Sequence, residues 1–382
     1  MKDKIRILIG NDMFHGGGVE YVLQTMSKYF LDKGYDVTIL ASPLDGQNIY
    51  DYYDPRVHFI RNRMRLKEYQ GFSIVRLFDY VICKAHNIIK KIQIRFMRYD
   101  IVIALKEGIT TKDLAHVKAK TKLAWFHCDH RNPNYKKILR DVFSEKQELK
   151  CMQCYDKVVC VAEASKDSII ETIGDPGNLC VLYNPIDWKK IRAQAAETPK
   201  FIKNPSKPLI VAVGRLHKVK NYPLMLKAAM LAHQKVEFDL WILGEGDQRE
   251  KIEKYISEKG LSYVKLLGMQ DNPYTIIKQA DFFLNTSTNE SNCIAIQEAY
   301  ILGVPVVAVK NPGTVECFSE DYTYIVDGSA KDVSEAIIRM IQDSSLRSGY
   351  KERIEKEYPL SMLYEDRMEL ICNLFDSSLK IR

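Results

Sequence analysis

Short apolar runs alternate with longer amphipathic stretches along most of the chain. In the N-terminal half the apolar runs predict strands at residues 4–11, 35–42, 57–60, 101–105, 122–127, 157–162 and 180–183. These runs are apolar at consecutive positions, so neither face of the strand is left for solvent. That pattern is typical of a parallel sheet covered by helices on both sides. The amphipathic stretches predict helices, among them residues 19–33 and 135–154.

The alternation breaks between residues 184 and 208. Asn184-Pro185-Ile186-Asp187 is a turn signal, and residues 197–208 contain three prolines. Proline fixes φ and removes a backbone donor, so the segment suits a connector better than a core element. Alternation then restarts. Further strands are predicted at residues 209–214, 238–244, 264–268, 281–286 and 305–309, and helices at 222–233, 248–259 and 361–375.

Strands alternating with helices, twice over, predict an α/β protein with two Rossmann-like domains. The predicted bounds are 1–195 for the first domain, 196–360 for the second, and 361–382 for a C-terminal helix that returns to the first. The length of 382 residues suits two such domains. Ligands of open α/β sheets lie beyond the carboxyl ends of the strands, so a cleft between the domains is the expected site.

The net charge of +7 is unevenly distributed. Residues 51–150 carry +11 and the remainder carries −4. Residues 61–98 interleave cations with apolar side chains, which favours peripheral contact with an anionic membrane surface. Aromatic residues also lie among these cations, but no recognised nucleic-acid module is present, so nucleic acid is not an expected partner.

Targeting and cysteine signals are weak. The first apolar run is too short for a signal peptide, and no run approaches the roughly 20 apolar residues of a membrane-spanning helix. The nine cysteines include one CxxC, Cys151 and Cys154, without a second pair to complete a zinc site. These features lead us to expect reduced thiols and a cytoplasmic location at the inner face of the cell membrane.

Two glycine turns follow predicted strands. The first is His15-Gly16-Gly17-Gly18-Val19-Glu20, and the second is Gly244-Glu245-Gly246. Glycine lets backbone approach a ligand closely, and a helix N-terminus favours phosphate. Neither turn matches a P-loop or G-x-G-x-x-G, so a plain structural turn is an equally simple interpretation.

Arginine, lysine and glutamate supply the stronger signals. Gly214-Arg215 ends a strand, and Lys220 follows five residues after Arg215. Such cations can neutralise a departing diphosphate without a metal. Glu290 and Glu298 lie eight residues apart across a loop and a helix start, where carboxylates can accept hydrogen bonds from sugar hydroxyls.

A histidine ends another predicted strand, in Trp125-Phe126-His127. It can orient or polarise a substrate hydroxyl. His127, Asp129 and His130 also allow a metal site, but alternation along a strand would separate them onto opposite faces. We therefore expect no metal.

With these motifs in order, the chain resembles glycosyltransferase family 4, whose members have the GT-B fold of two facing Rossmann-like domains. The matching positions are Gly17–Glu20, Arg215 with Lys220, Gly244–Asp247, Glu290 with Glu298, and His127. The segments at 105–111 and 124–127 are similar to those of bacterial enzymes of capsule, exopolysaccharide or lipopolysaccharide assembly.

The resemblance implies a retaining, metal-independent hexosyltransferase that needs no cofactor beyond its nucleotide-sugar donor. It implies that the amides of Gly17 and Gly18, with Arg215 and Lys220, hold the donor diphosphate. Glu298 would receive the ribose, and Glu290 and His127 would contact the transferred sugar. Gly214, Gly244 and Gly246 would shape the nucleotide pocket. The acceptor would be a glycan or a lipid-linked saccharide.

One departure leaves the donor sugar open. The family usually places glycine, then phenylalanine or a small residue, after the first glutamate, and here Ser291-Asn292-Cys293-Ile294 follows. These residues would border the donor sugar. UDP is the favoured nucleotide, with GDP as the alternative. A nucleotide-sugar 2-epimerase on the same fold and a non-catalytic partner subunit are the rival functions.

Overall fold

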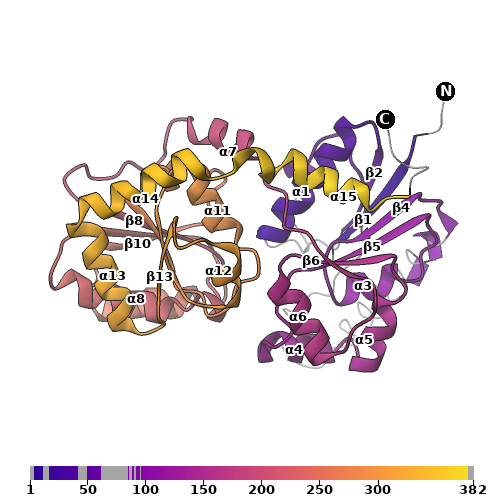
Figure 1. Ribbon diagram of the computed structural model, residues 1–382, viewed down its shortest axis with the longest axis horizontal. Helices are drawn as coiled ribbons and strands as arrows, with labels where there is room; N and C mark the ends of the chain where they lie inside the picture. Colours follow the sequence, from indigo (N-terminus) through magenta and orange to yellow (C-terminus); the bar gives the residue numbers. More distant parts are fainter. Residues whose placement is uncertain are drawn as a thin grey trace. The chain divides into compact units, whose positions relative to one another are not determined.

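The protein is described from a computed structural model, which places residues 4–11, 17–41, 50–61, 85, 88–89, 92–94 and 96–376. The chain divides into two compact units (Figure 1). Unit 1 comprises residues 1–185 and 365–382, and unit 2 comprises residues 186–364. Each unit contains one parallel sheet with helices packed against it, which confirms the prediction of two Rossmann-like domains.

Unit 1 is built on a seven-stranded sheet in the order β3-β2-β1-β4-β5-β6-β7. Its strands are β1 (Arg6–Asn11), β2 (Asp36–Ala41), β3 (His58–Arg61), β4 (Ile101–Ala104), β5 (Thr121–Phe126), β6 (Lys157–Cys160) and β7 (Leu179–Val181). Its helices are α1 (Gly18–Asp32), the short η1 (Tyr50–Tyr52), α3 (Ile109–Leu114), α4 (Pro133–Arg140), α5 (Glu145–Met152), α6 (Glu163–Thr172) and α15 (Glu365–Asn373). Ile7, Leu8 and Ile9 of β1 are all fully buried, as expected for a sheet covered on both faces.

Unit 2 is built on a six-stranded sheet in the order β10-β9-β8-β11-β12-β13. Its strands are β8 (Leu209–Val213), β9 (Asp239–Leu243), β10 (Val264–Gly268), β11 (Phe282–Asn285), β12 (Val306–Val309) and β13 (Thr323–Val326). Its helices are α7 (Trp188–Ala195), η2 (Lys218–Lys220), α8 (Tyr222–His233), α9 (Arg249–Glu258), α10 (Tyr274–Ile277), α11 (Ile294–Ile301), α12 (Pro312–Cys317), α13 (Ala330–Gln342), α14 (Ser344–Glu357) and η3 (Leu360–Leu363). The edge strand β13 was not predicted.

The division of the chain differs from the predicted bounds at both ends of unit 2. Helix α7 lies in the segment assigned to the first domain, but it packs against α10 and α11 and belongs to unit 2. The predicted helix over 361–375 is two elements, η3 and α15. The carbonyl of Leu363 accepts a hydrogen bond from the Ile186 amide at 2.8 Å, so it is not available to continue a helix.

The predicted helix over 135–154 is also two helices, α4 and α5. Ser144 begins α5 with a capping box: its hydroxyl accepts from the Gln147 amide at 3.3 Å, and the Gln147 side chain accepts from the Ser144 amide at 2.9 Å. A reciprocal cap of this kind satisfies donors only at a helix start. The capping-box sequence Ser144-Glu145-Lys146-Gln147 therefore already indicates that a new helix begins here.

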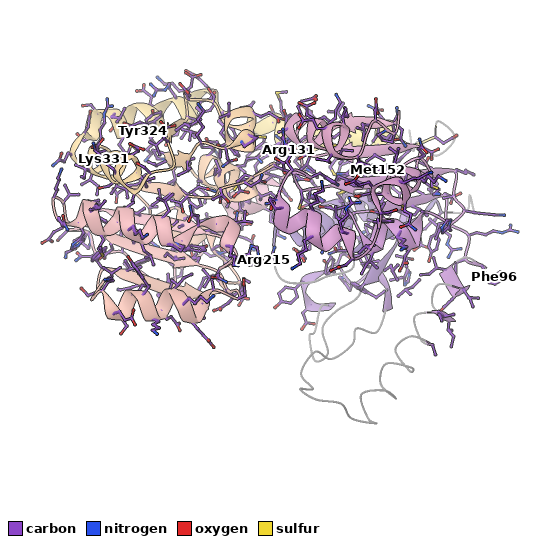
Figure 2. All side chains as sticks on the ribbon, turned by 90° about the horizontal axis from the view of Figure 1, so that it is seen from below. Phe96, Arg131, Met152, Arg215, Tyr324 and Lys331 are labelled. Atoms are coloured by element: carbon purple, nitrogen blue, oxygen red, sulfur yellow. The ribbon has the colours of Figure 1, made fainter. Side chains whose placement is uncertain are left out.

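The predicted membrane-contact segment, residues 61–98, lies mostly outside the described residues. Within the described part, Ile88, Ile89 and Ile92 are about half exposed and Phe96 is 83% exposed, projecting from unit 1 (Figure 2). Ile94 is buried. Among the described residues, no helix is long and apolar enough to cross a membrane.

The C-terminal tail packs into the core of unit 1. The ring of Phe375 lies 5.7 Å from Phe30 and 6.3 Å from Tyr35, measured between centroids. The Asp376 amide donates to Thr121 Oγ1 at 2.9 Å. Phe375 is only 3% exposed, so the tail contributes a large apolar side chain to this core.

Phe375→Ala should destabilise unit 1 by about 3–5 kcal/mol, because it removes a buried aromatic ring and leaves a cavity. Hydrogen exchange should therefore accelerate in α1 and β2. Leu370→Ala, which truncates a half-exposed side chain of α15, the helix just before Phe375, should change exchange little. Equal effects of the two variants would contradict this role of the tail.

Candidate active site

The strand order of unit 2 reverses between β8 and β11. β8 leads outward to β9 and β10, and β11 leads the other way to β12 and β13. The loops that follow β8 and β11 therefore leave the sheet next to each other, at the edge where all its parallel strands end. This is the position at which open α/β sheets bind ligands. The first loop carries Arg215 and Lys220, and the second carries Glu290.

Lys220 and Glu290 form an ion pair across these two loops. The Lys220 ammonium lies 2.6 Å from Oε1 of Glu290, and their side chains are only 23% and 11% exposed. Asn285 Nδ2 donates to the same carboxylate oxygen at 3.4 Å. The structure therefore brings together two of the predicted residues that are 70 positions apart in the sequence.

Burial and pairing act on this ion pair in opposite directions. Burial alone would lower the pKa of Lys220, but the Glu290 carboxylate raises it above its usual value. Burial would likewise raise the pKa of Glu290, but Lys220 and the surrounding hydrogen bonds hold it below its usual value. Each group thus keeps the other ionised at neutral pH.

Hydrogen bonds between the two loops fix the pair. Thr286 Oγ1 donates to the Lys220 carbonyl at 3.0 Å, and the Thr288 amide donates to the Val219 carbonyl at 2.9 Å. Asn221, directly after Lys220, has φ of 51°, a left-handed conformation that asparagine tolerates better than most residues. This turn ends η2 and starts α8, so Lys220 sits on a well-defined corner.

Glycines directly after β8 and β9 leave room for this arrangement. A Cβ on Gly214 would lie 3.1 Å from Cε of Lys220, so the lysine stem runs across the glycine. Gly244 has φ of 132°, and a Cβ there would lie 2.1 Å from the Gly214 carbonyl oxygen. A Cβ on Gly246 would lie 2.4 Å from the Leu216 carbonyl oxygen. Gly244 and Gly246 therefore shape the site by leaving space for the backbone of the loop that follows β8.

The start of α12 also contacts the backbone of Glu290, and the sequence analysis did not predict this contact. Asn311 Oδ1 accepts from the Glu290 amide at 3.2 Å and also from the Thr314 amide at 3.2 Å as the helix cap. A Cβ on Gly313 would lie 2.0 Å from the Glu290 carbonyl oxygen. The Asn-Pro-Gly sequence at 311–313, after a predicted strand, was the available signal.

The side chains of the four residues after Glu290 are buried in unit 2. Asn292 Oδ1 accepts from Gln297 Nε2 at 3.0 Å, and Cys293 Sγ lies 3.5 Å from Asn285 Nδ2. Ser291, Asn292, Cys293 and Ile294 are each less than a tenth exposed. Burial raises the pKa of the Cys293 thiol to about 12, so it stays protonated at neutral pH. This stretch can therefore meet a ligand mainly through its backbone amides at the start of α11.

Glu298, on α11, is 8% exposed and accepts a hydrogen bond from the Tyr274 hydroxyl at 3.0 Å. Burial raises the pKa of Glu298 to about 7, and the Tyr274 bond offsets part of that shift. A carboxyl group near half-protonation can both donate to and accept from a hydroxyl.

Arg215 differs from Lys220 in being exposed and in having no ion-pair partner among the described residues (Figure 2). It follows Gly214 directly after β8, which places its backbone at the edge where the strands end. With no such partner, all five of its N–H donors are available to an anion.

In unit 1 the glycine loop after β1 is described from Gly17 onward. Gly17 is the residue before α1, and its amide donates to Oε2 of Glu20 at 3.0 Å. That amide is thus occupied in this structure, whereas Gly18 is exposed at the first position of the helix. A phosphate at this terminus would have to displace the Glu20 carboxylate from Gly17.

His127 follows β5 at the corresponding edge of the unit 1 sheet. Its Nε2 lies 2.9 Å from the Leu105 carbonyl oxygen, and its amide donates to Oε2 of Glu107 at 3.2 Å. Burial lowers the pKa of His127, although Glu107 and the Leu105 carbonyl oppose that shift. The imidazole is therefore neutral at physiological pH. Glu107 is 5% exposed and was not predicted as a site residue.

Asp129 and His130 have partners other than His127. Asp129 Oδ1 accepts from Nε of Arg131 at 3.0 Å, and His130 Nε2 lies 3.2 Å from Glu148 Oε1. Within the ranges that the structure describes, no group of three histidine, cysteine or carboxylate side chains is arranged to hold a metal.

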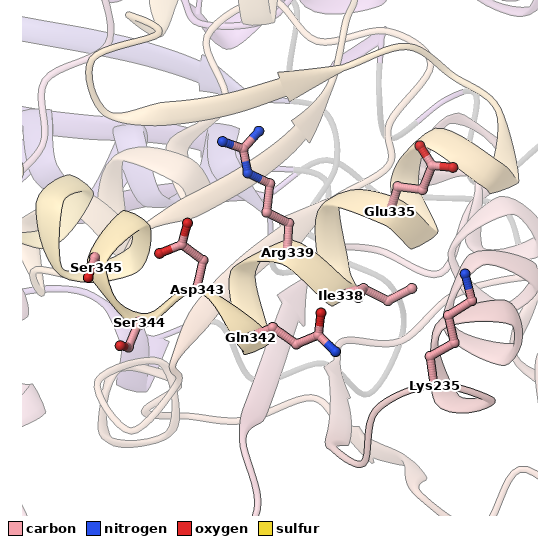
Figure 3. A pocket seen from close by; sticks show the side chains of 8 residues that line it. All are labelled: Lys235, Glu335, Ile338, Arg339, Gln342, Asp343, Ser344 and Ser345. Atoms are coloured by element: carbon pink, nitrogen blue, oxygen red, sulfur yellow. The ribbon is translucent and has the colours of Figure 1, made fainter.

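A cavity of about 490 Å³ lies elsewhere in unit 2, lined by residues of α13, the start of α14 and Lys235 (Figure 3). Helices α8 and α13 begin where their preceding strands end, and the cavity lies at their far ends. It is therefore at the opposite sheet edge from Lys220 and Glu290, and it is not part of the candidate site.

The raised pKa of Glu298 predicts a pH-dependent stability. The folded state binds this proton more tightly than the unfolded chain, so the contribution is present below about pH 4.5 and is lost as pH rises towards 7. The free energy of unfolding should fall by about 3 kcal/mol over this pH range, because each unit of pKa difference corresponds to roughly 1.4 kcal/mol. Glu298→Gln should remove it.

The measurement is urea unfolding between pH 4 and pH 8. Hydrogen exchange of the β11 amides reports the unfolding of unit 2. Glu250→Gln, at an exposed position of the same unit, should keep the wild-type pH dependence. If Glu298→Gln keeps it as well, the proposed burial of a protonated carboxyl is wrong.

Comparisons with known proteins agree with this geometry. Residues 16–190 match the family described as Glycosyltransferase Family 4, and residues 194–357 match Glycosyl transferases group 1. An uncharacterised glycosyltransferase of Methanocaldococcus jannaschii is 23% identical over 372 residues, covering 92% of each chain.

A second relative is the N-acetylgalactosamine-N,N'-diacetylbacillosaminyl-diphospho-undecaprenol 4-alpha-N-acetylgalactosaminyltransferase of Campylobacter jejuni. It is 28% identical over 207 residues, and the alignment covers 52% of this chain and 55% of that one, about half of its length.

Among solved structures, Anabaena Alr3699/HepE in complex with UDP and glucose matches 98% of this chain and all of its own, with a TM-score of 0.74 at 17% identity. This likeness concerns the fold. The two family matches together span most of both units, and the chain belongs to glycosyltransferase family 4, with the GT-B fold.

Proposed function

We propose that this glycosyltransferase moves a hexose-type sugar from a UDP-sugar to a glycan or lipid-linked acceptor in bacterial surface polysaccharide synthesis. Anomeric configuration is retained, and neither a metal nor another cofactor is needed. The observation that carries the proposal is the Lys220–Glu290 pair at the β8–β11 reversal, with the exposed Arg215 on the same loop as Lys220.

The two cations suit a departing diphosphate. A lysine ammonium has three N–H donors, and one is directed to Glu290, which leaves two for phosphate oxygens. Arg215 adds a planar fork that can hold two phosphate oxygens at once. Positive charge placed where negative charge develops lowers the barrier, which is the role that a metal would otherwise take.

The proposed step breaks the bond between the anomeric carbon and the diphosphate oxygen. An acceptor hydroxyl forms the new bond on the same face of the sugar, and its proton passes to the departing phosphate oxygen. In this proposal Glu290 contacts the sugar as positive charge develops on its ring. Glu298 contacts the ribose, a part of the donor that does not react.

The preference for UDP rests on a structural relative. Anabaena HepE was solved with UDP and glucose and shares the fold of both units. GDP is the alternative nucleotide.

A lipid-linked acceptor is supported by the Campylobacter relative, whose name specifies transfer to a saccharide on diphospho-undecaprenol. The proposal includes peripheral contact with the anionic inner face of the cell membrane through residues about 61–98. The exposed Phe96 and Ile89 support that part of it.

The test begins with thermal stabilisation by UDP, GDP and a panel of their sugar conjugates, because saturating ligand stabilises the state that binds it. We expect UDP-sugars to raise the melting temperature most. NMR should then show slow hydrolysis of the best donor with first release of the retained anomer, unchanged by excess EDTA. Release of the inverted anomer, loss of activity with EDTA that magnesium restores, or C2 epimerisation without release of UDP would each contradict the proposal.

Arg215→Ala should weaken donor binding and turnover ten- to a hundredfold, because a hydrogen bond to a charged group is worth about 1.5–3 kcal/mol. Lys218→Ala removes a cation three residues away, also exposed, and should be almost silent. Calorimetric UDP affinity and donor turnover decide the matter. Equal losses would indicate a diffuse basic surface in place of a specific phosphate contact.

A further inference from the structure

Glu107 occupies an unusual position for a carboxylate. It lies in the loop after β4, next to β1, where the strand order of the unit 1 sheet reverses. Its side chain is 5% exposed, and no ion-pair partner for it exists among the described residues. Burying a carboxylate without a cation costs free energy, so we expect such a group to have a role that offsets this cost.

The loop is built to hold Glu107 in place. Thr111 Oγ1 donates to the Lys106 carbonyl at 2.9 Å, and the Leu105 amide donates to the Gly10 carbonyl at 2.9 Å. Gly108 has φ of 93°, which side-chain-bearing residues rarely adopt, and it turns the chain directly into α3. One oxygen of Glu107, Oε2, accepts from the His127 amide. The other, Oε1, has no hydrogen-bond partner among the described residues.

The ring of His127 presents a second acceptor. Its Nε2 faces the Leu105 carbonyl, which can only accept, so Nε2 must carry the proton. The other nitrogen of the neutral ring, Nδ1, is then a lone pair, and it has no partner among the described residues. A neutral imidazole fixed in this tautomer accepts a hydrogen bond and cannot donate one from Nδ1.

Within the described residues, Oε1 of Glu107 and Nδ1 of His127 are two acceptors without a protein donor, held by adjacent loops, and together they suit a ligand with two donors. Phosphate is unsuitable because it would bring negative charge to a carboxylate. Sugar hydroxyls donate readily, and a carboxylate with a neighbouring acceptor suits a pair of them. Sequence reasoning identified His127 but not Glu107, because the two are 20 residues apart and are joined only by the pairing of β4 with β5.

We propose that Glu107 and Nδ1 of His127 form a subsite that accepts hydrogen bonds from hydroxyl groups of a sugar substrate, with Glu107 as a specificity-determining residue. The inference rests on the proposed function. The sugar is either the one transferred or the one that receives it, and the shared chemistry is the hydroxyl donor.

The test uses Glu107→Gln, which keeps one acceptor oxygen for the His127 amide but removes the charge. The probes are UDP and the UDP-sugar that stabilises the wild type most. We expect UDP affinity and melting temperature to match the wild type. Either hydrolysis of the UDP-sugar or transfer to a saccharide acceptor should fall by tenfold or more. A fall in hydrolysis identifies the transferred sugar, and a raised acceptor KM with normal hydrolysis identifies the acceptor.

Glu163→Gln is the matched control, because that carboxylate is 55% exposed in the same unit. It should behave as the wild type throughout. Unchanged hydrolysis and transfer in Glu107→Gln overturn the subsite, as does a parallel loss of UDP affinity and melting temperature, which would mark Glu107 as structural. A wild-type protein that processes no sugar nucleotide overturns the proposed function, and this inference with it.

Discussion

The ammonium of Lys220 and the carboxylate of Glu290 lie 2.6 Å apart and largely shielded from water, and three loops are shaped to keep them there. Removing two charges from water is costly, so such a pair persists only where geometry and further hydrogen bonds compensate. Thr286 and Thr288 tie the loops together, and Asn311 holds the Glu290 backbone. Truncating either charge would leave the other buried and unpaired. The pair therefore constrains which loop conformations unit 2 can adopt.

The two units use different chemistry at equivalent places. Unit 2 presents cations, with Arg215 exposed and Lys220 partly engaged, and these suit phosphate. Unit 1 presents acceptors, with a neutral histidine and a buried carboxylate, and these suit hydroxyl groups. Arg215, Lys220 and Glu107 follow strands at which the strand order reverses, and His127 follows β5, the strand next to β4.

Strands and isolated motifs could be predicted from the sequence because they depend on local pattern. The predicted strands correspond to observed ones within a few residues, and Tyr222–His233 is a helix as predicted. Two of the helix predictions failed because of specific hydrogen bonds. The capping box at Ser144 divides one predicted helix, and the Leu363 carbonyl, bonded to Ile186, interrupts another. The Lys220–Glu290 contact spans 70 residues, so the spacing of motifs indicated each residue but not their pairing.

Residues 291–293 depart from the usual family sequence after the first glutamate, and two of their side chains pack inside unit 2. Sequence reasoning placed these side chains beside the donor sugar, yet Asn292 is bonded to Gln297, and Cys293 lies against Asn285. The side chains of Asn292 and Cys293 are therefore engaged within unit 2. Gly313 limits the loop from the opposite side, since any Cβ there would meet the Glu290 carbonyl. Contacts from α11 and from the start of α12 therefore hold the backbone of residues 290–293 from both sides.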